Sequence, residues 1–168
     1  MTFTFFLLLQ LIIDYSKTLR DEEKTSYTYS SVFDDLALLN KNTNINLNMK
    51  SSIVVVNFWA SWCIPCIAEM SSLISLRNKF SPRDLEIVSI NGDDVEKFTQ
   101  VKNITKFKKV NFPIIYDSNG QFFDKFQINV LPLSLVFFKG KLYEIIHGVR
   151  NFVSTKEIEK FNDLLNSN

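Results

Sequence analysis

Blocks of apolar and polar positions predict a regular succession of strands and helices. The β-branched run SIVVVNFW (52–59) is apolar on both faces, which indicates a central strand that is covered on both sides. Directly after it, from Ile67 to Phe80, apolar residues recur at three and four positions, which is helical spacing. LEIVSI (85–90) is a second buried run. We therefore expect a strand–helix–strand unit with parallel strands.

The rest of the chain continues the alternation. In order, the patterns predict a helix, a short strand, a turn with a short helix, an antiparallel hairpin and a capped final helix, over residues 93–107, 112–117, 119–128, 131–148 and 154–166. Ahead of the first buried strand, residues 31–39 and 45–49 surround an Asn-rich turn and predict an N-terminal hairpin. This order describes an α/β fold, a thioredoxin-like three-layer sandwich with a mixed central sheet flanked by helices, an N-terminal hairpin and an inserted βα unit.

The N-terminal segment differs in character from the rest. Residues 1–13 are mostly apolar, but a helix of that length is shorter than a bilayer core. We interpret it as a signal or anchor segment, with a buried element of the domain as the alternative. Residues 14–31 are polar and predict a tether, and residues 32–168 form the folded domain. This organisation favours a place in the cell envelope, with a cytoplasmic location as the alternative.

Composition and charge narrow the function only slightly. The 168 residues suit one domain, and 46% apolar residues are enough for a sizeable core. A formal net charge of +1 gives no footprint for nucleic acid, so we expect no such partner. We also expect a monomer.

The two cysteines, Cys63 and Cys66, carry the chemistry. A structural zinc site needs four ligands, and the only other candidate is His147, far along the chain. A Cu(I) site with two thiolates has no further support nearby. A purely structural disulfide would close a very small loop and add little stability. We therefore expect no metal and no cofactor beyond a redox-active Cys63–Cys66 disulfide.

The position of this pair between a strand and a helix suits redox chemistry. Cys63 directly precedes the helical pattern, where unpaired amides and the helix dipole favour a thiolate. Pro65 lies in the first turn, where its missing N–H costs nothing. Cys66 lies within reach and is expected to be less exposed. We predict that Cys63 attacks the partner and Cys66 resolves the mixed disulfide, with Trp59 and Trp62 framing the site.

The stretch VVNFWASWCIPCIAEM (55–70) closely resembles the TlpA/ResA-like thiol-disulfide oxidoreductases of the bacterial envelope, which are thioredoxin-superfamily proteins related to CcmG/DsbE. The resemblance runs from about Val32 to the C-terminus. It implies a thioredoxin fold with a cis peptide between Leu131 and Pro132 beside the cysteines. In such a site Trp62, Ile64 and Pro65 would contact the substrate together with those two residues.

The proton acceptor of the reaction is less obvious. Many cytosolic thioredoxins have an acid where this chain has Asn57. Related envelope proteins place an acid after the second strand, which makes Asp93 or Asp94 a candidate, although either could be a helix N-cap. Glu69 is the third candidate.

The Ile64-Pro65 dipeptide predicts a reductant. Strong oxidants stabilise their thiolate heavily, often with a basic group, and Ile64 adds none. We expect protein disulfides as substrates, in apocytochrome c or copper-site assembly proteins, and the resemblance implies a membrane electron donor of the DsbD/CcdA kind. The alternatives are a general thioredoxin, a disulfide oxidase or isomerase, or a copper-binding module.

Overall fold

A computed structural model describes residues 2–42 and 45–167. Its elements follow the predicted order after residue 50. The helices are α1 (Thr2–Asn42), α2 (Ile64–Lys79), the short 3-10 helix η1 (Val95–Lys97), α3 (Phe98–Lys108), α4 (Gln121–Lys125) and α5 (Thr155–Asn166). The strands are β1 (Ile53–Trp59), β2 (Leu85–Asn91), β3 (Ile114–Tyr116), β4 (Leu133–Phe138) and β5 (Lys141–His147).

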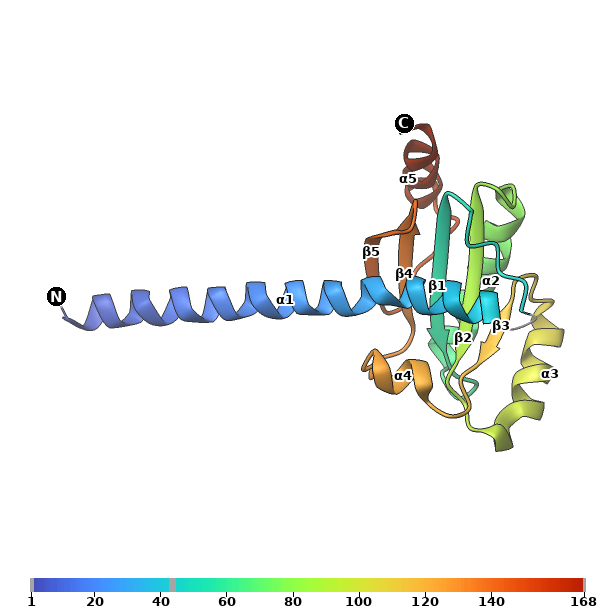
Figure 1. Ribbon diagram of the computed structural model, residues 1–168, viewed down its shortest axis with the longest axis horizontal. Helices are drawn as coiled ribbons and strands as arrows, with labels where there is room; N and C mark the ends of the chain where they lie inside the picture. The colour runs from blue at the N-terminus through green and yellow to red at the C-terminus, as the bar shows by residue number, and fades with distance from the viewer. Residues whose placement is uncertain (1, 43–44, 168) are drawn as a thin grey trace.

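The five strands form one mixed sheet in the order β3-β2-β1-β4-β5. The strands β1, β2 and β3 are parallel, whereas β4 runs antiparallel to β1 and forms a hairpin with β5. Helices cover both faces of the sheet (Figure 1). The predicted thioredoxin-like sandwich, including the inserted β3–α4 unit, is therefore confirmed.

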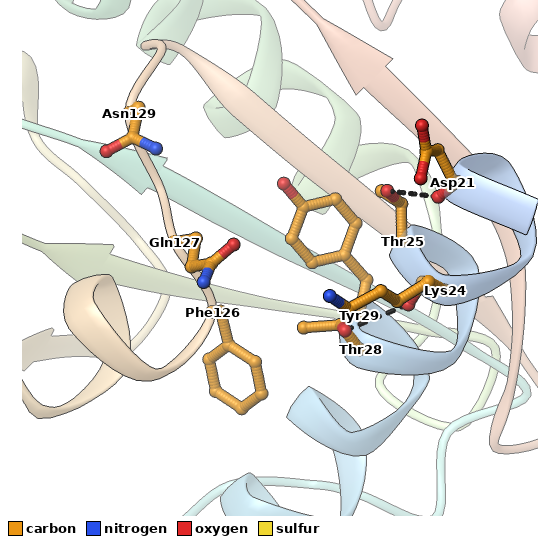
Figure 2. Close-up of a pocket in the computed structure, with 8 residues that line it drawn as sticks. All are labelled: Asp21, Lys24, Thr25, Thr28, Tyr29, Phe126, Gln127 and Asn129. Atoms are coloured by element: carbon orange, nitrogen blue, oxygen red, sulfur yellow. Dashed lines mark hydrogen bonds between the residues drawn. The ribbon is translucent and has the colours of Figure 1, made fainter. Parts of the chain in front are cut away.

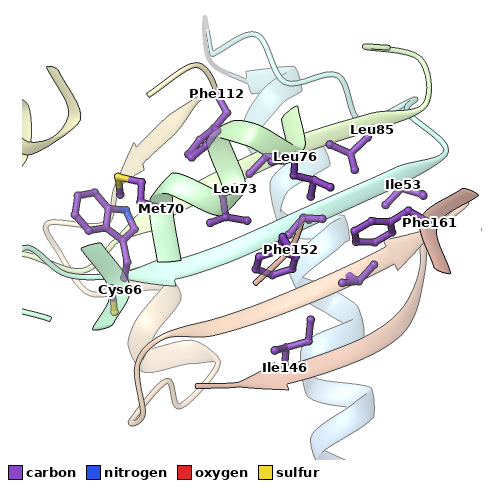
Figure 3. Packing of buried hydrophobic residues seen from close by; sticks show 14 of the residues in the cluster. Ile53, Cys66, Met70, Leu73, Leu76, Leu85, Phe112, Ile146, Phe152 and Phe161 are labelled. Carbon is purple, nitrogen blue, oxygen red and sulfur yellow. The ribbon is translucent and has the colours of Figure 1, made fainter. Parts of the chain in front are cut away.

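Alternation along β1 divides the core into two halves. Ile53, Val55 and Trp59 point toward α2 and α5, whereas Val54 and Phe58 point toward α1 and α4. Figure 3 shows the first half, in which α2 lies over the sheet with its apolar side chains pointing down onto the strands. Because β1 is buried along its whole length, its C-terminal end is a rigid point from which the next segment departs.

The predicted N-terminal hairpin is wrong. Residues 31–39 belong to α1, and residues 45–48 have no regular structure. The reason is the spacing of the apolar residues: Tyr29, Val32 and Leu36 follow each other at three and four positions and all pack on the sheet. The predicted tether, residues 14–31, lies in the same helix, so packing begins three residues before the expected domain start.

The N-terminal part of α1 projects away from the sheet (Figure 1). Its apolar side chains are exposed at Leu7, Leu8, Leu9, Leu11, Ile12 and Ile13. Within residues 2–42 and 45–167, no helix combines the length and apolar character that a bilayer-crossing segment needs.

Candidate active site

The cysteine pair lies where β1 gives way to α2. Cys63 is the N-cap of α2, and its Sγ accepts a hydrogen bond from the backbone N–H of Cys66 at 3.3 Å. Cys63 and Cys66 form a disulfide, with an S–S distance of 2.03 Å. Pro65 lies in the first turn, as predicted. The end of the helix therefore directs a backbone N–H at the sulfur of Cys63, and that interaction favours a thiolate there.

The two tryptophans near the cysteine pair differ in solvent exposure. Trp62 is 68% exposed and Ile64 79% exposed, so both flank the cysteines as an accessible apolar surface. Trp59 is fully buried in the core cluster that contains both cysteines, so of the two tryptophans only Trp62 offers accessible aromatic surface. Cys63 and Cys66 are 5% and 3% exposed, and the expected asymmetry between them is therefore small. The roles of attacking and resolving cysteine are therefore assigned from position: Cys63 is the N-cap of α2, and Cys66 lies in its first turn.

A second segment reaches the same edge of the sheet. The Leu131–Pro132 peptide is cis, as the family resemblance implied. Leu131 packs against the cluster that contains both cysteines, and Phe58 is the register partner of Leu133. The carbonyl of Pro132 accepts a hydrogen bond from Gly148 at 2.9 Å. The approach to β4 thus lies at the edge of the sheet from which α2 departs, and the exit from β5 is hydrogen-bonded to it.

Beneath α2 lies a buried polar group around Glu69, which is 2% exposed. The Nδ2 of Asn57 donates to Glu69 Oε2 and to Ser134 Oγ, both at 3.0 Å. Asn57, Ser134 and Ser89 are register partners on three adjacent strands, and all three are buried. The backbone N–H of Arg150 donates to Glu69 Oε1 at 2.7 Å. Each oxygen of this carboxyl group therefore has a donor.

Burial controls the titration of this group. Desolvation raises the pKa of Glu69 from its ordinary value to about 7, against the opposing effects of the Arg150 N–H, the Asn57 amide and the Arg150 charge. Glu69 follows Cys66 by three residues on α2, so the two side chains share a helix face. A carboxyl group with such a pKa can accept or release a proton near neutral pH.

The two aspartates after β2 have different places. Asp93 is buried and accepts hydrogen bonds from the backbone N–H of Ser61 (2.6 Å), from its hydroxyl (2.9 Å) and from Asn91 Nδ2 (2.7 Å). It thereby holds the loop between β1 and α2. Asp94 is exposed at the N-cap position of η1 without a side-chain capping bond. Of the three predicted acids, the structure places Glu69 beneath α2 and Asp93 behind the loop.

A hollow on the surface lies away from the cysteine pair. One hollow of about 290 Å³ lies between α1 and the segment before the cis peptide (Figure 2). Its lining consists of Asp21, Lys24, Thr25, Thr28, Tyr29, Phe126, Gln127 and Asn129. Neither cysteine lines it, so the hollow is separate from the redox pair. Among the described residues, no three His, Cys, Asp or Glu side chains come together as metal ligands.

Sequence reasoning missed Ser134 and Arg150. Ser134 accepts a hydrogen bond from Asn57, 77 residues earlier, and Arg150 donates one to Glu69, 81 residues earlier, so no local motif marks them. The only available signal was Ser134 itself, a polar residue in an otherwise apolar strand. Arg150 acts through its backbone N–H, which every residue type except proline offers.

Comparison with known proteins gives consistent matches. The model of the AhpC/TSA family matches residues 31–147. The thiol-disulfide oxidoreductase ResA of Bacillus cereus is 32% identical over 102 residues, which are 60% of this chain and 58% of that protein. ResA of Oceanobacillus iheyensis is 34% identical over 97 residues, covering 56% and 49%. The chain thus spans about half the length of the curated relatives it matches.

A solved structure agrees with these matches. The crystal structure of StoA from Bacillus subtilis aligns with a TM-score of 0.56 at 25% identity, over 67% of this chain and 84% of that one. The similarity to ResA and StoA supports the resemblance drawn from the residues around the cysteines.

Proposed function

Because the chain belongs to the AhpC/TSA family of the thioredoxin superfamily, we propose that it is a thiol-disulfide oxidoreductase that reduces disulfides in partner proteins. The observation that carries this proposal is the Cys63–Cys66 disulfide at the N-terminus of α2. A backbone N–H directed at one sulfur, with a second sulfur held one turn away, is what two-step thiol exchange needs.

The reaction proceeds by two exchanges. The thiolate of Cys63 attacks one sulfur of the partner's disulfide, whose S–S bond breaks as the mixed disulfide forms, and the other partner sulfur leaves as a thiolate. The thiolate of Cys66 then attacks Cys63 Sγ, releases the second partner sulfur and closes the Cys63–Cys66 disulfide. Two electrons pass to the partner. A membrane donor of the DsbD/CcdA kind returns them.

Glu69 is the proton acceptor that we favour for Cys66. It lies on the same face of α2, is buried, and has a pKa of about 7. Asp93 is a weaker candidate because its oxygens already accept bonds from Ser61 and Asn91. Asp94 is exposed to solvent. We therefore assign the proton step to Glu69 and a positioning role in the Ser61 loop to Asp93.

The partner binds over an exposed apolar surface around the cysteines. Trp62 and Ile64 supply accessible side chains, and Pro65 shapes the helix start. Leu131, which packs against the cluster of the cysteines, and Pro132 complete this surface. An extended segment of the partner pairs with the backbone of Leu131. The partners are disulfides of the cell envelope, in apocytochrome c or copper-site assembly proteins, and the apolar residues 1–13 hold the enzyme at a membrane.

The direction of the reaction follows from the residues between the cysteines. Ile64 contributes no positive charge, so the Cys63 thiolate gains its stabilisation from the helix terminus and local amides. In equilibrium with glutathione or dithiothreitol, we expect a potential below about −220 mV, in the range of reductants. A potential near −120 mV, typical of strong oxidants, would contradict the proposed reductase and indicate an oxidase.

Single-cysteine variants test the assigned order. Cys66→Ser leaves the attacking thiol in place, so the variant should accumulate a mixed disulfide with a model protein disulfide. Cys63→Ser is the matched control and should form none. Equal trapping by both variants would contradict the assignment of the nucleophile.

A further inference from the structure

Arg150 is joined to α2 through its backbone. Its N–H donates to Glu69 Oε1 at 2.7 Å, and its carbonyl accepts from Ser72 Oγ at 3.2 Å. The N–H of Phe152 donates to the same hydroxyl at 3.4 Å. The segment after β5 therefore lies against the turn of α2 that carries Glu69.

The side chain of Arg150 belongs to a cluster of four charges. Its Nη1 contacts Glu157 Oε1 at 3.0 Å, and its Nη2 contacts Glu144 Oε1 at 3.5 Å. Lys160 Nζ contacts the second oxygen of each carboxylate, both at 2.5 Å. Two cations and two carboxylates thus alternate between β5 and α5.

Burial makes this cluster a firm support. The side chain of Glu157 is 3% exposed, whereas that of Arg150 is 36% exposed. A buried carboxylate without a cation is strongly unfavourable, so Glu157 holds the guanidinium in one place. The backbone of Arg150 and its charge are thereby fixed relative to α2.

We propose that Arg150 is a positioning residue for Glu69: anchored by Glu157 and Glu144, it holds its own N–H on the Glu69 carboxyl group and brings a positive charge near it. The proposal rests on the proposed function, in which Glu69 takes the proton of Cys66. Both effects favour the carboxylate, which burial alone would disfavour.

The groups around Glu69 come from several elements. Cys66 lies three residues before Glu69 on α2, and the loop after β5 provides Arg150. β1 and β4 contribute the uncharged Asn57 and Ser134. Arg150 contacts Glu157 and Glu144, and with Lys160 the cluster holds two charges of each sign. Arg150 is the one charge among these groups whose effect on Glu69 is attractive and direct.

Titration of Glu69 itself tests the proposal without requiring activity. In the 168-residue chain labelled with ¹³C-glutamate, the Glu69 carboxyl signal is assigned by its loss in Glu69→Gln. Arg150→Met keeps the backbone N–H but removes the charge and its anchorage. We expect the Glu69 midpoint to rise above about 7, so the ionised fraction at pH 7 falls below that of the unmodified chain.

The controls separate positioning from simple loss of structure. Lys160→Met removes a cation from the same cluster but has no contact with Glu69. It should lower the melting temperature as Arg150→Met does, yet leave the Glu69 midpoint in place. Arg150→Lys should return the midpoint toward that of the unmodified chain.

Two results would overturn the proposal: an unchanged midpoint in a folded Arg150→Met variant, or an equal rise in Lys160→Met. The fate of the proposed function is decided separately. If Glu69→Gln exchanged thiols at the unmodified rate, Glu69 would lose its proton role, while the Arg150 titration would still show whether Arg150 positions it.

Discussion

Burial of the Glu69 carboxyl group lowers the stability of the fold above about pH 7, and the same burial suits the group to proton transfer. It is buried beneath α2, and its two oxygens take donors from β1 and from the loop after β5. Those bonds do not cancel the loss of water, because the pKa remains at about 7. In the folded protein, Glu69 is therefore mostly protonated below about pH 7.

A pH-dependent stability follows. The pKa of Glu69 is raised above its unfolded value of 4.5, so the folded chain binds more protons between that pH and about 7, and its stability falls as pH rises through this window. Glu69→Gln removes that loss. At pH 8 the variant should be more stable than the unmodified chain by up to roughly 3 kcal/mol, and at pH 4.5 the gain should vanish.

Urea denaturation of the oxidised proteins at both pH values measures this difference. Glu159→Gln, an exposed carboxyl group on α5, serves as the matched control and should show no such trend. A Glu69→Gln variant whose gain is equal at pH 4.5 and pH 8 would contradict the raised pKa.

Residue by residue, local chemistry was predictable and long-range contacts were not. The positions of Cys63 and Pro65 follow from a strand running straight into a helical pattern. The cis peptide before Pro132 needed the family resemblance. The bond from Arg150 to Glu69 spans 81 residues and depends on how α5 and β5 pack, which no local pattern encodes.

At the scale of elements, α1 is the instructive case. Val32 and Leu36 are four residues apart, which is equally compatible with a helix and with one face of a strand. The Asn-rich stretch that follows favoured a hairpin, but Tyr29 extends the same apolar line toward the N-terminus at helical spacing. The buried elements β1, α2 and β2 carried a stronger pattern and were predicted correctly.

Docking of α1 can be tested by removing one buried side chain. Leu36 is fully buried against the sheet, and Leu36→Ala should lower the free energy of unfolding by about 2–4 kcal/mol. Leu38 lies on the same helix but is 56% exposed, so Leu38→Ala should change it by less than about 0.5 kcal/mol. Equal losses in urea denaturation would show that this part of α1 does not pack as described.

On the scale of the whole molecule, α1 connects the apolar N-terminal segment to the domain that carries the cysteine pair, because its C-terminal part packs on the sheet. The apolar side chains between Leu7 and Ile13 are exposed, on the part of α1 that projects beyond the sheet (Figure 1). Such a surface is suited to the boundary of a lipid layer. This arrangement supports the proposed place of the enzyme at a membrane.

Binding to vesicles tests that placement. The unmodified chain should sediment with phosphatidylglycerol-containing vesicles, and Leu11→Asp combined with Ile12→Asp should weaken binding at least about tenfold. Phe107→Asp alters another exposed apolar residue, 84% exposed on α3, and should leave binding unchanged. Loss of binding in both variants would point to a general surface effect instead.

Because α1 is one unbroken helix, the length of its N-terminal part sets both the distance of the domain from the apolar segment and its rotation about the helix axis. Residues 14–28 form about 22 Å of helix between the apolar start and the first buried apolar side chain, Tyr29. Each added residue would lengthen this stretch by only about 1.5 Å but rotate the domain by about 100° around its axis. The azimuth at which Cys63 faces its surroundings is therefore far more sensitive to the length of this stretch than its height is. Insertions near whole turns, of about four or seven residues, would preserve that azimuth, whereas an insertion of two would turn the dithiol to the opposite side.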